Sequence, residues 1–90
     1  MHRMKISKEK KDKIKEQILS FLFHEFPKTY FTAQVAREIA RDEEFVKDLL
    51  QDLKKDKLVS AIKKNPEGIE YSRRIRWRLS KKAYNAYKHN

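Results

Sequence analysis

The clearest chemical pattern in the sequence is a run in which arginine occupies every second position, at Arg74, Arg76 and Arg78. A spacing of two places these side chains on one face of an extended strand, while the apolar residues between them point the other way. A guanidinium can make two parallel hydrogen bonds to a phosphate and can enter a narrow minor groove of DNA. The run therefore predicts a strand with a polyanion-binding face. The alternative is an edge strand that its charge keeps soluble.

The charge of the whole chain supports a polyanionic partner. The 90 residues include 23 Lys and Arg against 13 Asp and Glu, a formal net charge of +10. Residues 1–32 carry eight basic and four acidic side chains, residues 33–56 carry five and seven, and residues 57–90 carry ten and two. Nucleic acid is the commonest partner of so basic a domain. The excess charge lies in the last third of the chain, whereas the central segment is slightly acidic.

Patterns typical of enzymes and metal sites do not occur in the sequence. There is no Cys, the histidines His2, His24 and His89 are scattered, and no Gly-rich phosphate loop or nucleophile motif is present. We therefore expect no catalysis, no cofactor, no metal and no small-molecule ligand. No apolar run is long enough to span a membrane, and we expect a cytoplasmic protein. The 40% of charged residues, rich in Lys and Glu, favours a thermophilic source.

The spacing of apolar residues predicts three helices in the first two thirds of the chain. After a basic arm over residues 1–6, Ser7 caps a helix that runs to about Glu25, and its broad apolar surface needs two buried sides. Following a short extended piece at residues 30–32, Thr32 is expected to cap a second helix over residues 33–40. Asp42 is expected to cap a third helix that runs to about residue 56 and buries Val46, Leu49, Leu50 and Leu53.

A β-hairpin and a last helix are predicted after residue 57. One strand covers residues 58–63, a turn follows at residues 65–68, and a longer strand covers residues 69–79. In that strand the parity of Trp77 favours core packing over base stacking. Ser80 is expected to cap a short final helix, so that residues 7–90 form a single domain.

This order of elements resembles the winged helix-turn-helix family over nearly the whole chain. The strongest segment is FTAQVAREIARDEEFVKDLLQDLKKDKLVSAI, and the ending RIRWRLSKKAYNAY is similar to the last wing strand and C-terminal helix of small archaeal transcriptional regulators. Ala40 stands where the family often has Gly at the turn, and Arg41 stands where an aliphatic residue is common. The resemblance implies an α+β fold with a three-helix core, a β-hairpin wing and a short C-terminal helix.

The resemblance also implies where DNA would bind. The third helix of the family enters the major groove, which indicates the exposed residues Glu44, Lys47, Asp48 and Gln51. The wing, defined here as the predicted hairpin, supplies the candidate phosphate or minor-groove contacts Lys63, Lys64, Arg73, Arg74, Arg76 and Arg78. The acidic start of the third helix could accept hydrogen bonds from cytosine, or it could only stabilise the helix dipole.

The first and last helices form a dimer interface in many regulators of this family. The resemblance therefore implies a homodimer through Leu19, Phe23, Phe26, Tyr84 and Tyr87. The alternative is that the last helix folds back in the monomer and covers the extra apolar face of the first helix. A dimer would bind two half-sites about one helical turn apart on double-stranded DNA.

Together these patterns predict a small transcriptional regulator that binds double-stranded DNA through a basic wing and a recognition helix. Two alternatives remain at this stage. One is an RNA-binding or ribosome-associated winged helix, which would also be small and basic. The other is a protein-interaction domain that docks through its acidic third helix, because a fold does not by itself define a function.

Overall fold

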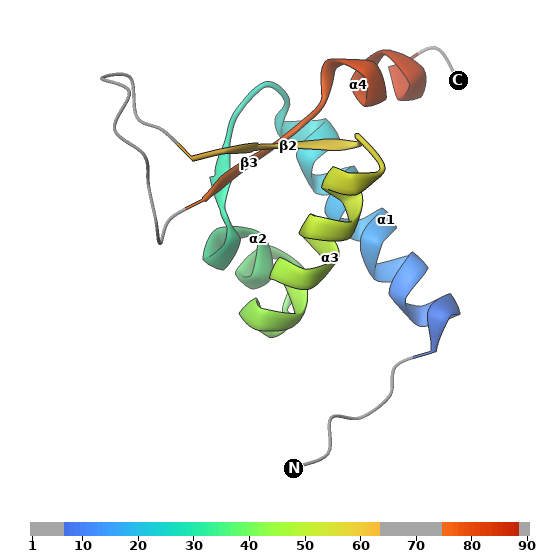
Figure 1. Ribbon diagram of the computed structural model, residues 1–90, viewed down its shortest axis with the longest axis vertical. Coiled ribbons are helices and arrows are strands. Elements are labelled where there is room, and N and C mark those ends of the chain that lie inside the picture. The colour runs from blue at the N-terminus through green and yellow to red at the C-terminus, as the bar shows by residue number, and fades with distance from the viewer. Residues whose placement is uncertain (1–6, 64–74, 89–90) are drawn as a thin grey trace.

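The computed structural model describes residues 7–63 and 75–88, and these form four helices and one small sheet (Figure 1). The elements in chain order are α1 (Lys8–Glu25), β1 (Tyr30–Phe31), α2 (Thr32–Ile39), α3 (Glu43–Lys55), β2 (Val59–Ile62), β3 (Arg76–Leu79) and α4 (Lys81–Lys88). The predicted arm at residues 1–6, the turn at residues 65–68 and the first part of the second wing strand lie outside the described residues.

Three of the predicted helix caps are confirmed. The Ser7 hydroxyl accepts a hydrogen bond from the Lys10 backbone N–H at 3.2 Å, and Asp42 Oδ2 accepts one from the Phe45 N–H at 3.1 Å. Ser80 Oγ accepts one from the Ala83 N–H at 3.0 Å. Each bond satisfies a backbone donor that has no partner within its own helix.

The predicted cap of α2 is wrong. Phe31 occupies the N-cap position and Thr32 is already helical, while the Gln34 side chain accepts a hydrogen bond from the Phe31 N–H at 2.8 Å. The Thr32 hydroxyl instead accepts a hydrogen bond from the Trp77 indole N–H at 2.8 Å. A contact between distant parts of the chain has therefore replaced the local one, and it ties the start of α2 to the middle of β3.

The turn between α2 and α3 has the left-handed residue that this motif requires. Ala40 adopts φ 56° and ψ 49°, and the next N–H, that of Arg41, donates to the Ala36 carbonyl at 2.9 Å. Glycine adopts this conformation without the steric cost that a Cβ imposes, which explains why it is common at this position. The turn ends α2 and allows α3 to begin three residues later.

The sheet is antiparallel with the order β1-β3-β2, so β3 is the central strand. Tyr30 pairs with Trp77 on one side of β3, and Ala61 pairs with Trp77 on the other. The alternative of a solvated edge strand for the arginine run is therefore wrong for Arg76 and Trp77, because β1 and β2 pair with these residues from both sides.

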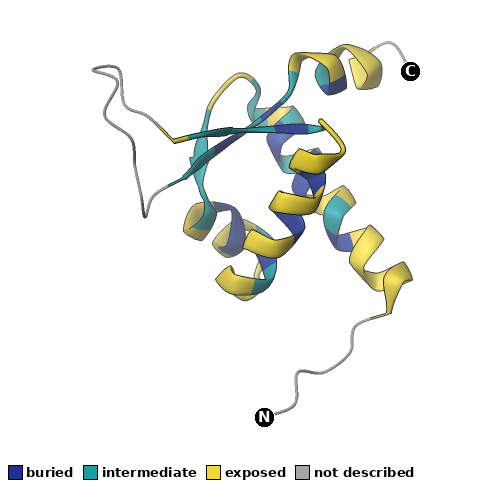
Figure 2. Ribbon diagram, in the orientation of Figure 1, coloured by how far each residue is buried: buried dark blue, intermediate teal, exposed yellow. Residues whose placement is uncertain are grey.

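One face of the sheet closes the hydrophobic core, α1, α2 and α3 form most of the rest, and α4 adds Ala83 (Figure 2). Trp77 is 1% exposed, which confirms the predicted packing beneath the wing. The buried apolar residues are Ile14, Ile18, Leu19, Leu22, Val35, Ala36, Val46, Leu49, Leu50, Leu53, Val59, Trp77, Leu79 and Ala83. Among the described residues no polar or charged side chain is fully buried. The charged groups therefore lie on the surface, where a partner can reach them.

Candidate nucleic-acid interface

The outer face of the sheet presents two of the predicted wing arginines. Because successive residues of a strand point to opposite faces, Arg76 and Arg78 lie opposite the buried Trp77 and Leu79. Both arginines are half-buried. The Arg76 guanidinium lies over the Phe31 ring of the neighbouring strand, 5.4 Å from its centroid. This packing restricts the stem of Arg76 and holds the group on the outer face.

The other predicted wing residues differ in how far the structure describes them. Lys63 directly follows β2 and is exposed. Lys64, Arg73 and Arg74 lie outside the described residues. The described part of the wing thus contributes Lys63, Arg76 and Arg78 to the candidate interface.

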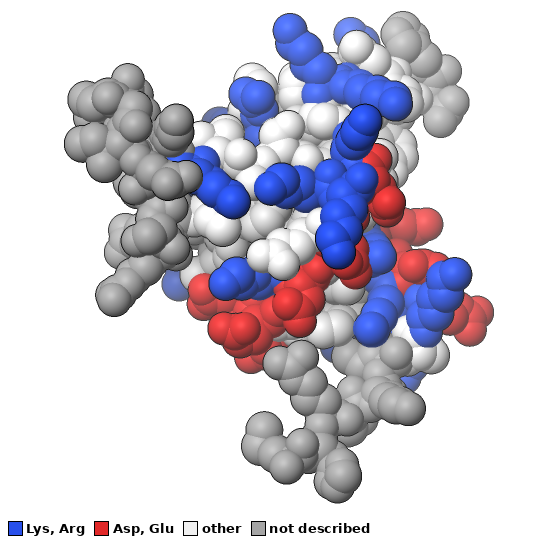
Figure 3. Space-filling view, viewed as in Figure 1, with Lys and Arg blue, Asp and Glu red and all other residues white. Residues whose placement is uncertain are grey.

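The predicted recognition residues of α3 form an exposed stripe opposite the core. Glu44, Lys47, Asp48 and Gln51 are all exposed, whereas Leu49 and Leu50 are buried. The stripe contains two acidic residues, one Lys and the neutral Gln51, and the exposed Lys54 and Lys55 follow it in the last turn of the helix. Figure 3 shows acidic side chains gathered over the beginning of α3, with Lys and Arg over its later turns and the strands. The two halves of the same helix therefore present opposite charge.

A groove of about 280 Å³ runs between the later half of α3 and the wing strands. Its polar lining comes from Gln51, Lys54, Lys55 and Lys63, and its apolar lining from Ala61, Ile75 and Trp77. Lys54 and Lys55 were not among the contact residues predicted from the sequence. Their positions three and four residues after Gln51 place all three side chains on one side of the helix, and that spacing was the available signal.

Asp52 lies one residue from this lining but is engaged elsewhere. Its Oδ2 atom is 3.6 Å from the Nζ atom of Lys15 on α1. The carboxylate is thus directed toward α1, and a cation there offsets its charge. A surface pair of this kind contributes little to stability, but it holds the Asp52 carboxylate on the side of α3 that faces α1.

The residues predicted to form a dimer interface contact one another within a single chain. The rings of Phe26 and Tyr84 stack with centroids 4.1 Å apart and planes at 12°, and Phe23 lies 5.2 Å from Tyr84. Leu19 is only 5% exposed. These contacts join α4 to α1, as the fold-back alternative expects, and such aromatic pairs add stability beyond their buried area.

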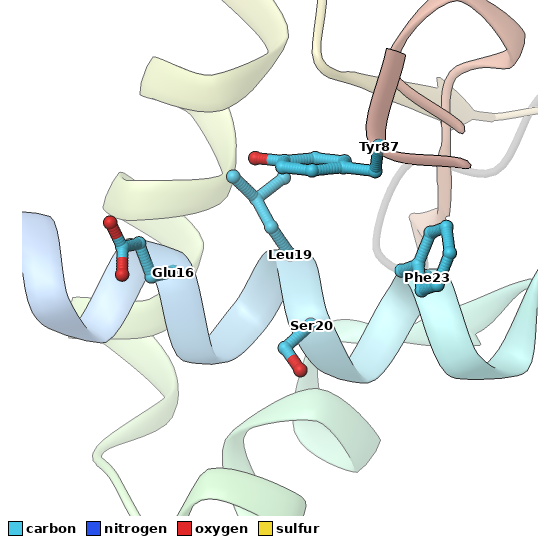
Figure 4. Close-up of a pocket in the computed structure, with 5 residues that line it drawn as sticks. All are labelled: Glu16, Leu19, Ser20, Phe23 and Tyr87. Carbon is cyan, nitrogen blue, oxygen red and sulfur yellow. The ribbon is translucent and has the colours of Figure 1, made fainter. Parts of the chain in front are cut away.

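An open surface nevertheless remains between α1 and α4. Tyr87 is 43% exposed and reaches from α4 over α1, where a pocket of about 420 Å³ is lined by Glu16, Leu19, Ser20, Phe23 and Tyr87 (Figure 4). Tyr87 is the one large hydrophobic side chain that is exposed in the described part of the chain. Of the predicted dimer residues, Leu19 is buried, Phe23, Phe26 and Tyr84 are half-buried, and Tyr87 is exposed.

One titratable group beside the sheet is perturbed. The Tyr30 hydroxyl donates a hydrogen bond to Glu25, and this bond, followed by partial desolvation and the negative charges of Glu25 and Glu38, raises the pKa of Tyr30 above 10.0. The bond ties the end of α1 to β1.

Two further searches gave negative results. Residues 7–63 and 75–88 contain no group of three or more His, Asp and Glu side chains arranged to hold a metal ion. No helix within the same ranges has the length and apolar character needed to cross a membrane.

The arrangement of α2, α3 and the wing strands is a winged helix-turn-helix of the α+β class, as the sequence predicts. Solved structures of bacterial regulators share it. A mutant of ZitR from Lactococcus lactis in its apo form matches with a TM-score of 0.68 and 21% identity, over 90% of this chain. A second ZitR structure, described as a zinc-responsive MarR family member, matches with a TM-score of 0.64 and 20% identity over 97% of this chain. A MepR mutant from S. aureus matches with a TM-score of 0.66 and 17% identity over 83% of this chain.

These matches establish the fold. The matched proteins are longer than this chain. The chain spans about half the length of the structures it matches: 56% and 52% of the two ZitR chains and 51% of the MepR chain. No protein-family model and no curated protein sequence matches the chain.

Proposed function

We propose that the protein is a transcriptional regulator that binds double-stranded DNA through its wing and α3, and that it is not an enzyme. The observation that carries the proposal is the pair Arg76 and Arg78 on the outer face of the sheet, within a winged helix-turn-helix fold. The wing contacts would come from Lys63, Lys64, Arg73, Arg74, Arg76 and Arg78, and the base-reading residues would be Glu44, Lys47, Asp48 and Gln51. Phosphate contacts by arginine would supply most of the affinity, and α3 would select the sequence.

The proposal includes the organisation and setting of the chain. Residues 7–90 would act as one winged-helix domain in the cytoplasm, preceded by a basic arm over residues 1–6. The fold likeness to bacterial regulators supports a role in transcription. The similarity of the C-terminal segment to archaeal regulators and the thermophilic composition stay predictions from the sequence.

Salt-dependent binding to a random duplex tests the DNA-binding role. The variant Arg74→Gln/Arg76→Gln removes two charges from the wing while keeping polar stems, which matters because Arg76 packs on Phe31. Each lost phosphate contact lowers the slope of log affinity against log salt by about 0.9, so we expect a decrease of about 1.8. The matched control Lys11→Gln/Lys13→Gln removes two charges from the exposed first half of α1.

The controls also decide between DNA and the alternatives. Equal slopes in the wild type and the wing variant would contradict a DNA-binding wing. Tighter binding to structured RNA than to duplex DNA at equal salt would favour the RNA alternative. The proposal is supported if the wild type binds the duplex, the slope of log affinity against log salt is flattened in the wing variant, and that slope is unchanged in the α1 control.

The acidic beginning of α3 favours a second candidate, a protein-docking surface. The exposed carboxylates Glu43, Glu44 and Asp48 would repel a phosphate backbone but could contact a basic partner protein. Changing all three to lysine should strengthen generic DNA binding if this end of α3 faces DNA. If the end is instead a docking surface, the same change should abolish capture of the partner and leave DNA binding unaltered.

We further propose that the regulator is a homodimer formed through the α1–α4 surface. The exposed Tyr87 beside the pocket at Phe23 supports a second copy as its occupant, because large apolar groups at a pocket rim are typical of interfaces. Sedimentation of the wild type and Tyr87→Ser at high micromolar concentration tests this. A dimer that the substitution dissociates supports the proposal, whereas a monomeric wild type contradicts it.

A further inference from the structure

The groove between the later half of α3 and the wing strands combines a cationic rim with an apolar floor. Its rim carries three cationic side chains, Lys54, Lys55 and Lys63, and one amide, Gln51. Its floor is apolar and includes the nearly buried Trp77. A cleft that is lined by charges of one sign and has low-dielectric walls concentrates the electric field of those charges. Such a cleft attracts an anionic chain more strongly than the same lysines would on a flat surface.

We propose that this groove holds the phosphate backbone of one nucleic-acid strand, with Lys54 and Lys55 on one wall and Lys63 on the other. The inference rests on the proposed nucleic-acid binding and names a contact surface within it. Lysine suits the role because its ammonium group is a compact charge with three rotatable donors on a flexible stem. The three ammonium groups can therefore adapt to phosphates at several positions along the groove.

The charge along α3 decides which half of the helix meets the phosphates. Glu43 and Glu44 stand in its first turn, where the helix dipole stabilises negative charge, and Lys54 and Lys55 stand in its last turn, where the dipole stabilises positive charge. Approach by the first turn would bring carboxylates toward a phosphate backbone. Approach by the last turn brings lysines toward it (Figure 3).

The positions of the neighbouring groups agree with this assignment. Asp52 lies between Gln51 and the two lysines in sequence but pairs with Lys15 of α1, so its charge is directed away from the groove. Gln51 precedes the two lysines on α3 and is the lining residue nearest in sequence to Lys47 and Asp48. It is thus placed between the phosphate-binding lysines and the rest of the exposed face, where an amide can contact a base edge.

The test compares Lys54→Gln/Lys55→Gln with Lys11→Gln/Lys13→Gln and the wing variant Arg74→Gln/Arg76→Gln, using fluorescence anisotropy with a labelled random duplex of about 20 base pairs. Each substitution pair removes two positive charges, and glutamine keeps helix propensity close to that of lysine. Circular dichroism melts verify that each variant is folded. Between about 50 and about 200 mM salt, loss of two phosphate contacts should make the fall in affinity roughly twelve-fold smaller, whereas the α1 control should match the wild type.

The outcomes separate this inference from the proposed function. If the wing variant has a flattened salt dependence but Lys54→Gln/Lys55→Gln behaves as the wild type, the groove assignment is overturned and DNA binding stands. If the wild type does not bind the duplex, the proposed function fails first. A third outcome is that poly-glutamate displaces DNA from the wild type at equal charge concentration and binds Lys54→Gln/Lys55→Gln more weakly than the wild type. The groove would then bind an acidic protein segment, which also overturns the assignment.

Discussion

Replacing Thr32 by valine removes one hydroxyl and deprives the Trp77 indole N–H of its acceptor. The bond is 2.8 Å long and connects the start of α2 to the central strand of the sheet. Trp77 is 1% exposed but Thr32 is half-buried, so water can replace the lost acceptor only in part. A buried donor without a partner costs about 1 to 3 kcal/mol, and because the site is only partly buried we expect a value in the lower part of that range. We expect a net loss of about 1 to 2 kcal/mol in the free energy of unfolding.

A double-mutant cycle isolates that bond from the change in shape. In a Trp77→Phe background no indole donor remains, so Thr32→Val should cost close to nothing there. The coupling energy between the two positions should therefore be about 1 to 2 kcal/mol, measured by urea denaturation with circular dichroism. Thr29→Val makes the same chemical change in the loop before β1 and serves as the control, with an expected effect of about 0.5 kcal/mol or less.

The result that would refute this reasoning is an equal cost of Thr32→Val in both backgrounds. It would mean that valine disturbs α2 for a reason unrelated to Trp77, such as the loss of a local bond to the helix backbone. A measurable coupling would show that the wing and the helix-turn-helix are held together by this contact. The relative position of the two parts of the proposed interface would then depend on it.

Two further predictions concern the backbone turn and the ionisation of tyrosine. Ala40→Gly removes the steric cost of a Cβ in the left-handed conformation at φ 56° and should stabilise the fold by about 0.5 to 1 kcal/mol. The control Ala33→Gly, within α2, should destabilise the fold by a similar amount. Denaturation curves in which both changes destabilise would contradict this account. The neutral Tyr30 hydroxyl donates to Glu25, which raises its folded pKa above the unfolded value near 10.0, so the unfolded state releases its proton first and stability falls as the pH rises past that value. Melting curves should show a larger alkaline loss of stability for the wild type than for Tyr30→Phe; equal losses would mean that the bond to Glu25 does not govern this ionisation.

Several features of the protein follow from short-range patterns in the sequence. The caps at Ser7, Asp42 and Ser80 depend on a side chain that reaches a backbone N–H only three residues away. The buried positions of α3 repeat with the period of a helix, and Trp77 and Leu79 alternate with arginines as a strand requires. These features depend on neighbours within one or two turns, so spacing alone predicts them.

Other features depend on contacts between distant residues, and the sequence alone did not decide them. Thr32 was expected to cap α2, but its hydroxyl bonds to a residue 45 positions later. The arginine run could have formed an edge strand until the pairing of β1 with β3 placed it at the centre of the sheet. In each case the local propensity was compatible with two outcomes.

The candidate site shows the same division. Composition and alternation indicated a basic strand and an exposed α3 stripe, but the groove that joins Lys54 and Lys55 to Lys63 exists only because α3 and β2 pack side by side. The stacking of Phe26 on Tyr84 likewise brings α4 onto α1 within one chain. The sequence by itself determined the helices, the caps at Ser7, Asp42 and Ser80, and the sign of the charge on each segment. Only the tertiary structure decided which charged segments share a surface, because that depends on the docking of elements far apart in the chain.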